Sequence, residues 1–205
     1  NVATAGVERM ELGATTIFNE DGADVDFRIE GDTQANLFYV DAGNDKIGVN
    51  ENVPLGKFHI KTADASVTSV NSGADELVLE NNGTCGLTIL SSSSTEGIIA
   101  FGDNGASAGG KIAYNHSGDK LSFVTNSSTA ITIDSSGRVL IGTTSTDDYD
   151  GFDSHLQVTG TSADDSSVTI SRFSNNGSGA NLILGKSRTG TIGNNAVLQA
   201  GDTIA

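Results

Sequence analysis

Short apolar runs of three or four residues recur along the whole chain, separated by turns rich in Asn, Asp, Gly and Ser. Apolar and polar residues alternate in several runs, as in Val25-Asp26-Phe27, which is typical of a strand with one buried face. Asn-Gly and Asp-Gly recur in the turns, where positive φ costs them little. The pattern predicts seven hairpin-like units, at 16–27, 40–49, 76–90, 98–114, 114–123, 133–142 and 168–184.

One strand-turn-strand phrase is repeated, and a longer duplication contains it. Segments 40–49 and 114–123 share the same spacing, and 133–142 is one residue shorter. A further apolar run follows two of the copies, at 58–60 and 156–158. A chain built on one repeated hairpin favours a scaffold over a single catalytic pocket.

No window keeps a helical spacing of apolar residues for long. The nearest, 7–12, is too short to stand alone as a helix. We therefore expect an all-β protein with little or no helix. Its organisation is predicted as an N-terminal β repeat segment at 1–62, a central β repeat module at 63–160 and the truncated start of a further module at 161–205.

The apolar content points to an oligomer. Eight Phe, three Tyr and no Trp in 205 residues supply one large core poorly, and an isolated hairpin is marginal in water. Three parallel copies would cover each other's apolar faces and pair open strand edges. The expected fold is an elongated, intertwined homotrimeric β fibre of short hairpin repeats. A single-chain β-helix is the alternative, but it needs more regular spacing.

Charge and targeting signals restrict the partners. The net charge of −15, with only 11 basic residues spread singly, argues against nucleic acid. No apolar run reaches the length of a membrane span, and no basic and then apolar segment resembles a signal peptide, so no membrane insertion is expected. The single cysteine, Cys85, excludes an intrachain disulfide and is expected to be a small buried residue.

Catalytic motifs fail on their context. Residues 105–109 match the G-x-S-x-G nucleophile elbow, and Asp134 and His155 follow in hydrolase order. The elbow needs a strand-to-helix turn, whereas a strand is predicted to follow at 111–114. We interpret 105–109 as a hairpin loop, expect no enzyme activity, and assign no catalytic or cofactor-binding residue.

Two features raise the question of metal binding. The acidic run Asp147–Asp153 partly resembles a calcium loop but lacks the EF-hand register, so a solvated linker is favoured over weak cation binding. His59 and His155 have no nearby ligand in sequence, although a threefold axis could gather one His from each chain. His116 is predicted to be a solvent-facing turn residue. No metal ligand is assigned.

Five further segments are informative: 7–13, 18–30, 37–41, 110–117 and 131–143, the last of which contains the phrase Ile-Asp-Ser-Ser-Gly. These segments resemble the repeat region of tailed-bacteriophage tail fibres. The resemblance implies a homotrimeric structural fibre that attaches the virion to the host cell. Its implied partners are two further copies, other tail or baseplate proteins, and a host glycan or protein receptor. The implied location is the tail fibre of the virion, assembled in the host cytoplasm.

Further expectations and alternatives accompany this resemblance. Such fibres often end in an intramolecular chaperone domain, which would lie beyond residue 205. The alternative functions are a glycan-depolymerising tailspike, which needs a carboxylate pair in an aromatic groove, and a bacterial surface adhesin. Cation-dependent adsorption is a secondary hypothesis, because a chain of charge −15 is repelled by anionic cell surfaces.

Overall fold

The computed structural model describes residues 2–4, 7–12, 16–19, 21–148, 151, 153–173, 175, 177, 179–184, 187 and 192, with side chains from Ile17 onward. These ranges contain strands and no helix, which confirms the all-β prediction. They accordingly hold no helix that could cross a membrane. The chain divides into two compact units, Asn1–Thr88 and Ile89–Ala205, which are described separately. The predicted boundaries at 62 and 160 stay predictions.

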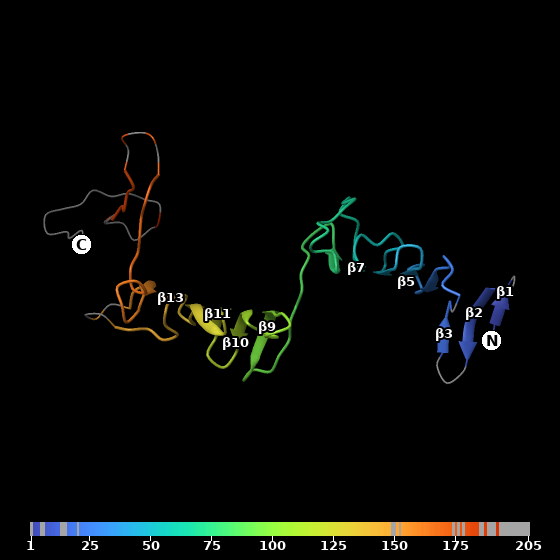
Figure 1. Ribbon diagram of the computed structural model, residues 1–205, viewed down its shortest axis with the longest axis horizontal. Helices are drawn as coiled ribbons and strands as arrows, with labels where there is room; N and C mark the ends of the chain where they lie inside the picture. The colour runs from blue at the N-terminus through green and yellow to red at the C-terminus, as the bar shows by residue number, and fades with distance from the viewer. Residues whose placement is uncertain are drawn as a thin grey trace. The chain divides into compact units, whose positions relative to one another are not determined.

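The part of the first unit that the structure describes forms two sheets (Figure 1). One is antiparallel, in the order β1 (Val2–Thr4), β2 (Val7–Leu12), β3 (Thr16–Phe18). The other is ordered β4 (Phe27–Ile29), β5 (Phe38–Asp41), β6 (Lys46–Val49), β7 (Phe58–Lys61), β8 (Leu77–Glu80). Within it, β4, β5 and β6 pair antiparallel, whereas β6, β7 and β8 pair parallel. The rings of Phe18 and Phe27 lie 5.0 Å apart and connect the two sheets.

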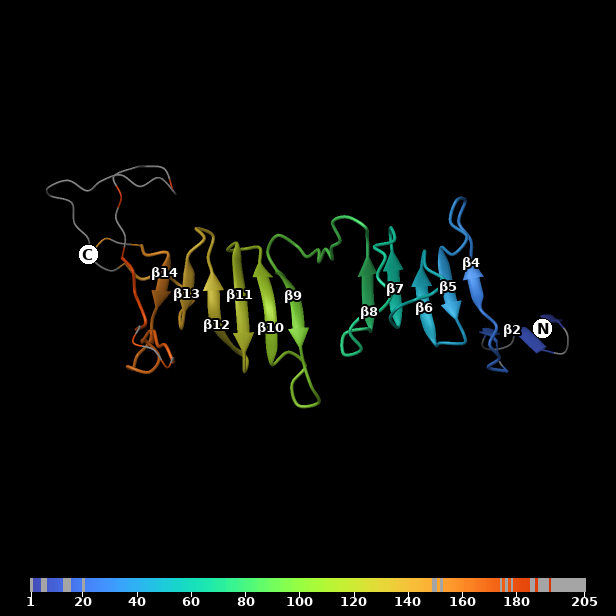
Figure 2. The ribbon, with the colours of Figure 1, turned by 90° about the horizontal axis from the view of Figure 1, so that it is seen from above.

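The described residues of the second unit form one six-stranded sheet whose neighbours follow chain order (Figure 2). Its strands are β9 (Glu96–Phe101), β10 (Gly110–Asn115), β11 (Lys120–Thr125), β12 (Ser128–Ile133), β13 (Val139–Ile141) and β14 (Leu156–Val158). The first five strands pair antiparallel, and β14 pairs parallel to β13. Both units therefore carry a mixed sheet of short strands.

The two copies of the phrase with equal spacing, 40–49 and 114–123, form similar turns. In the β5–β6 turn the carboxylate of Asp41 accepts a hydrogen bond from the Asn44 amide, and in the β10–β11 turn Asn115 accepts one from the Gly118 amide. Each turn closes on an aspartate with positive φ, Asp45 at 53° and Asp119 at 47°. Side chains of Asp and Asn bond their own turn readily and tolerate this conformation. The shared spacing in sequence therefore encodes a shared local structure.

The longer duplication is also structural. After the β5–β6 hairpin the chain crosses over at 50–57 and places β7 parallel to β6. After the β12–β13 hairpin it crosses over at 142–155 and places β14 parallel to β13. Parallel neighbours cannot be joined by a tight turn, so each crossover loop must pass across one face of its sheet.

Four of the seven predicted hairpins form, and three are wrong. The β5–β6, β9–β10, β10–β11 and β12–β13 hairpins match the predictions. The first fails because β3 pairs with β2 and β4 with β5. In the third, residues 87–90 form no strand, and in the seventh neither 168–173 nor 179–184 does; part of its turn lies outside the described residues. A two-stranded hairpin without a covered face lacks the burial that stabilises it.

Candidate functional site

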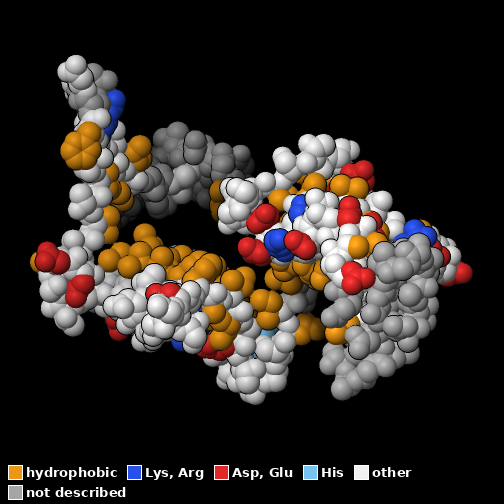
Figure 3. All heavy atoms as spheres, turned by 45° about the vertical axis from the view of Figure 1, so that its right-hand side comes forward, with side chains coloured by type: hydrophobic (Ala, Val, Ile, Leu, Met, Phe, Trp, Pro, Cys, Tyr) orange, Lys and Arg blue, Asp and Glu red, His pale blue; other side chains and the backbone are white. Residues whose placement is uncertain are grey.

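One face of the six-stranded sheet is an uncovered apolar surface. Cross-strand register aligns two rows, Ile99, Ile112, Phe123, Ile131, Ile141 and Val158, and Tyr114, Leu121, Ile133, Val139 and Leu156. We call these residues the β9–β14 apolar face. None of them is buried, and Phe123, Ile99 and Leu156 are 37%, 46% and 61% exposed. Figure 3 shows a band of hydrophobic side chains along one side of this unit.

The opposite face of the same sheet holds the small core. Ala113, Thr132, Leu140 and Gln157 occupy one cross-strand row there, and all four are buried. The Gln157 amide accepts a hydrogen bond from the Asp147 backbone N–H and donates one to the Asp147 carbonyl, both at 3.2 Å. The crossover loop is thereby fastened across this face, which leaves the apolar rows on the other side.

The five-stranded sheet of the first unit repeats this division. Phe27, Val40, Ile47, Phe58 and Leu77 form a row across all five strands, and none of them is buried. We call this row of five residues the β4–β8 apolar face. An open groove of about 580 Å³, lined by Phe18, Phe27, Phe38 and Val40 among others, adjoins it.

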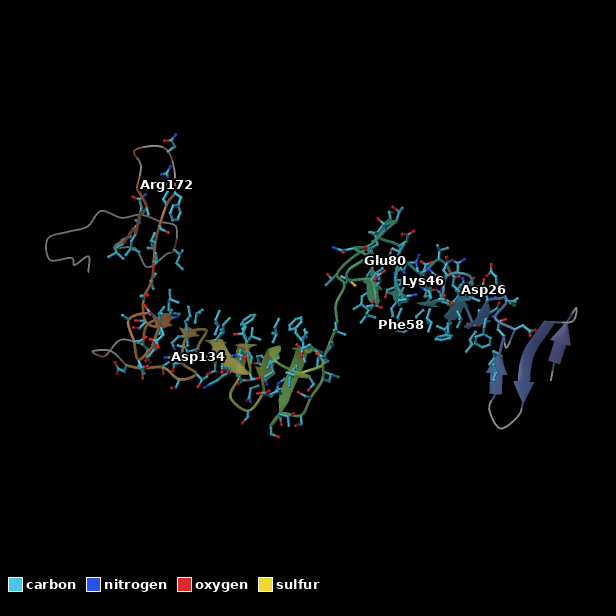
Figure 4. All side chains as sticks on the ribbon, in the orientation of Figure 1. Asp26, Lys46, Phe58, Glu80, Asp134 and Arg172 are labelled. Atoms are coloured by element: carbon cyan, nitrogen blue, oxygen red, sulfur yellow. The ribbon has the colours of Figure 1, made fainter. Side chains whose placement is uncertain are left out.

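The other side of the five-stranded sheet carries a buried charge cluster. Figure 4 shows Lys46 and Glu80 on this side of the sheet and Phe58 on the opposite side. Within the cluster, His59 is 0% exposed, Glu51 6% and Glu80 8%. Their potential ligand atoms all lie within 4.8 Å of one another.

Most polar atoms of the cluster are bound. Glu51 accepts a hydrogen bond from the Val53 amide and pairs with the Lys61 ammonium. Glu80 accepts one from the Ala65 amide at 2.7 Å, and His59 Nδ1 accepts one from the Leu55 amide at 3.2 Å. His59 Nε2 differs, because the Glu80 carboxylate oxygen lies 2.9 Å away but in a direction that makes no hydrogen bond.

Two further carboxylates, those of Asp134 and Asp26, accept hydrogen bonds in or near turns. The pKa of Asp134 itself is shifted, and Asp26 shifts the pKa of Tyr39. Burial opposes ionisation of Asp134, but hydrogen bonds from Arg138 and from the Ser136 amide outweigh it and hold its pKa below the ordinary value. The Asp26 carboxylate, which accepts a hydrogen bond from the Tyr39 hydroxyl, raises the pKa of that phenol to about 12. Asp26 also accepts from the Ala42 amide and so ties β4 to the β5–β6 turn.

The structure brings no hydrolase triad together. Residues 105–109 lie in the loop between β9 and β10, so a strand follows the G-x-S-x-G sequence as predicted. Every hydrogen bond described for the Asp134 side chain runs within its own turn. Neither Ser107 nor His155 is among its partners in the described part of the chain.

The acidic run and the remaining histidines are also placed. Asp147 and Asp148 are exposed, Asp153 pairs with Arg138 at 2.8 Å, and positions 149, 150 and 152 lie outside the described residues. His155 is exposed immediately before β14. His116 is half-buried, with its ring 5.0 Å from that of Tyr114 in an edge-on arrangement.

The expectation for Cys85 is wrong, and His59 lies in surroundings that the sequence did not predict. Cys85 is exposed, not buried, because residues 84–90 run along the surface outside any strand. His59, considered only for an axis between chains, instead meets two carboxylates of its own chain. The sequence carried a weak signal of a polar cluster, because His59 and Lys61 are two residues apart in a strand and therefore lie on the same face. Nothing local in the sequence indicated Glu51 or Glu80.

Comparisons with known proteins add no identification. No family model matches the chain, and no curated protein matches it significantly. The features of this chain that bear on its function are the apolar faces, the buried cluster and the resemblance seen in the sequence.

Proposed function

We propose that this chain is a structural segment of a bacteriophage tail fibre, in which three copies form a shaft that attaches the virion to its host cell. The observation that carries the proposal is the pair of uncovered apolar faces, one on each mixed sheet. The phage assignment rests on the resemblance of the repeat segments, and the trimer on the need to cover these faces.

The β9–β14 apolar face is large for a surface exposed to water. Its eleven residues come from all six strands, and none of them is buried. A standard protein interface buries roughly 800 Å² per partner. Contiguous patches of that size mark interaction surfaces, and covering them gains about 25 cal/mol per Å².

A second copy of the chain is the occupant that fits both faces. The same division recurs in both units, with an apolar side left open and a polar side closed by a crossover loop. A foreign partner would have to match two separate surfaces, whereas parallel copies place like faces together around one axis. The net charge of −15 per chain favours solubility of the assembly.

The test is the mass of the native oligomer in solution. We expect three times the chain mass of 20.9 kDa, measured by native mass spectrometry and sedimentation. A stable monomer would overturn the fibre proposal and favour the single-chain β-helix.

Attachment is tested separately with the labelled oligomer on a panel of bacterial cells. Binding that falls when divalent cations are lowered at fixed ionic strength would support the cation hypothesis, and unchanged binding would end it. Incubation with surface polysaccharides of the bound strain should release no fragments. Their release would favour the glycan-depolymerising alternative.

A further inference from the structure

We propose that Glu51, His59 and Glu80 form a binding site for one divalent transition-metal ion per chain, with Zn²⁺ as its best-suited occupant. This site lies within a single chain and does not depend on the fibre proposal.

The donor set matches zinc chemistry. Zinc is bound by imidazole nitrogen and carboxylate oxygen in tetrahedral sites, with three protein ligands and one open position in many cases. Here one imidazole and two carboxylates converge, and all three residues are more than nine-tenths buried. Three exposed acidic groups would carry no such implication, because their charges would be satisfied by water.

His59 Nε2 is the atom that points to a missing partner. It is inaccessible to water, yet no residue in the described ranges forms a hydrogen bond with it. The nearest carboxylate oxygen, from Glu80, lies to one side at 2.9 Å. Buried polar atoms are nearly always satisfied, so an unsatisfied nitrogen beside two carboxylates suits a cation that all three can share.

Bringing the ligands onto a metal requires small movements. Ligands of a tetrahedral zinc with bonds of about 2.1 Å lie roughly 3.4 Å apart. The three donors here span at most 4.8 Å, so the Glu51 carboxylate must approach His59. The ring proton must also move to Nδ1, which releases the long contact from the Leu55 amide.

Lys61 holds the place of a cation in the metal-free cluster. Its ammonium neutralises Glu51 and retains 22% side-chain exposure. A pocket of about 360 Å³ lined by Glu51, Lys61, Asp64 and Glu80 opens beside it, so an ion can enter from solvent and the ammonium can move outward. When a divalent ion replaces the Lys61 ammonium, its two positive charges balance the two negative charges of the Glu51 and Glu80 carboxylates.

The experiment titrates the metal-free full chain with Zn²⁺ by calorimetry and with Co²⁺ by visible absorption. We expect one ion per chain, in contrast to one per three chains for an axial site. His59→Gln and Glu80→Gln should each lower the affinity more than about 100-fold, beyond the usual effect of outer-shell changes. Glu96→Gln, which removes an exposed carboxylate from the other unit, should leave the affinity unchanged.

Lys61→Met provides a variant that keeps every ligand. Removal of the competing ammonium should raise Zn²⁺ affinity roughly tenfold, the worth of one charge-assisted hydrogen bond. An affinity that falls or stays the same in this variant would overturn the site. An affinity that is unchanged in Glu80→Gln would also overturn the site, because it would show diffuse binding to an acidic surface. A Co²⁺ spectrum identical to that of the aqueous ion would overturn it as well.

Discussion

His59 and Gln157 occupy equivalent positions in the two units of this protein. Each is the second residue of a strand that pairs parallel to its predecessor, opposite Gly48 in one case and Leu140 in the other. Each is buried, and each binds the backbone of the crossover loop that precedes it. The duplication therefore extends to the interior, where a polar side chain fastens each loop.

This equivalence predicts that glutamine can replace His59. In His59→Gln the new amide can accept from the Leu55 N–H and donate to Glu80, so the free energy of unfolding should stay within about 1 kcal/mol of wild type. His59→Leu leaves the buried Leu55 N–H without its acceptor and should cost about 1–3 kcal/mol. Denaturant unfolding in a chelating buffer measures both, and equal losses would contradict the proposed equivalence.

Asp134 should give the second unit an acid-sensitive stability. Its pKa lies below the ordinary 3.8 in the folded chain, so its contribution is present above that value and is lost as pH falls through the folded-state pKa. Asp134→Asn should cost about 2 kcal/mol near neutral pH, as expected for hydrogen bonds to a buried charge. The difference from wild type should shrink in acid.

Chemical unfolding across a pH series checks the Asp134 prediction. Asp148→Asn, which changes an exposed carboxylate in the crossover loop, is the matched control and should match wild type at every pH. A cost for Asp134→Asn that stayed constant down to strongly acidic pH would show that its charge is not responsible.

Phe123 tests the role of the β9–β14 apolar face. It lies in the longer of the two rows and is 37% exposed within one chain. Phe123→Glu should leave the β content of the chain intact but prevent the proposed trimer from forming, because three carboxylates would be forced into an apolar interface. Ser117→Glu places the same charge in an exposed turn and should remain trimeric.

Native mass spectrometry together with circular dichroism separates the two effects of Phe123→Glu. A variant that remains trimeric would exclude this face from the contact between copies. A variant that loses its β signal as a monomer would show that the chain needs its partners in order to fold, as intertwined fibres do.

Gly48 should tolerate no side chain. A Cβ at this position would overlap the carbonyl oxygen of Glu51, because the short crossover at 50–57 passes directly over β6. Gly48→Ala should therefore cost about 1–3 kcal/mol through overpacking. Gly86→Ala, which has open space around its Cβ, should change stability by less than about 0.5 kcal/mol. Thermal unfolding of both variants makes the comparison, and equal stabilities would refute it.

Local signals predicted local structure well. The turns at 41–46, 115–120 and 134–138 were expected from their Asp, Asn and Gly residues, and each forms. Residues 87–90 have the same apolar character as a strand but pair with nothing in the described chain. Strand propensity is satisfied only by a neighbour, and the neighbour is not encoded in the strand itself.

The residues of the buried cluster could not be predicted as a group from the sequence either. His59 was visible as a rare residue, but Glu51 lies in a crossover loop and Glu80 ends the next parallel strand. Parallel pairing joins segments through long connections, so no spacing rule links these three residues in sequence. Their burial together followed only from the path of the loops.

The sequence by itself determined that this protein is built of short strands, where its repeated turns lie, and that apolar residues alternate with polar ones. Those properties depend on neighbours within a few residues. The tertiary structure decided which strands pair in parallel, which face each crossover loop closes and which apolar face remains open. These depend on contacts between distant segments, whose free energy no local pattern contains.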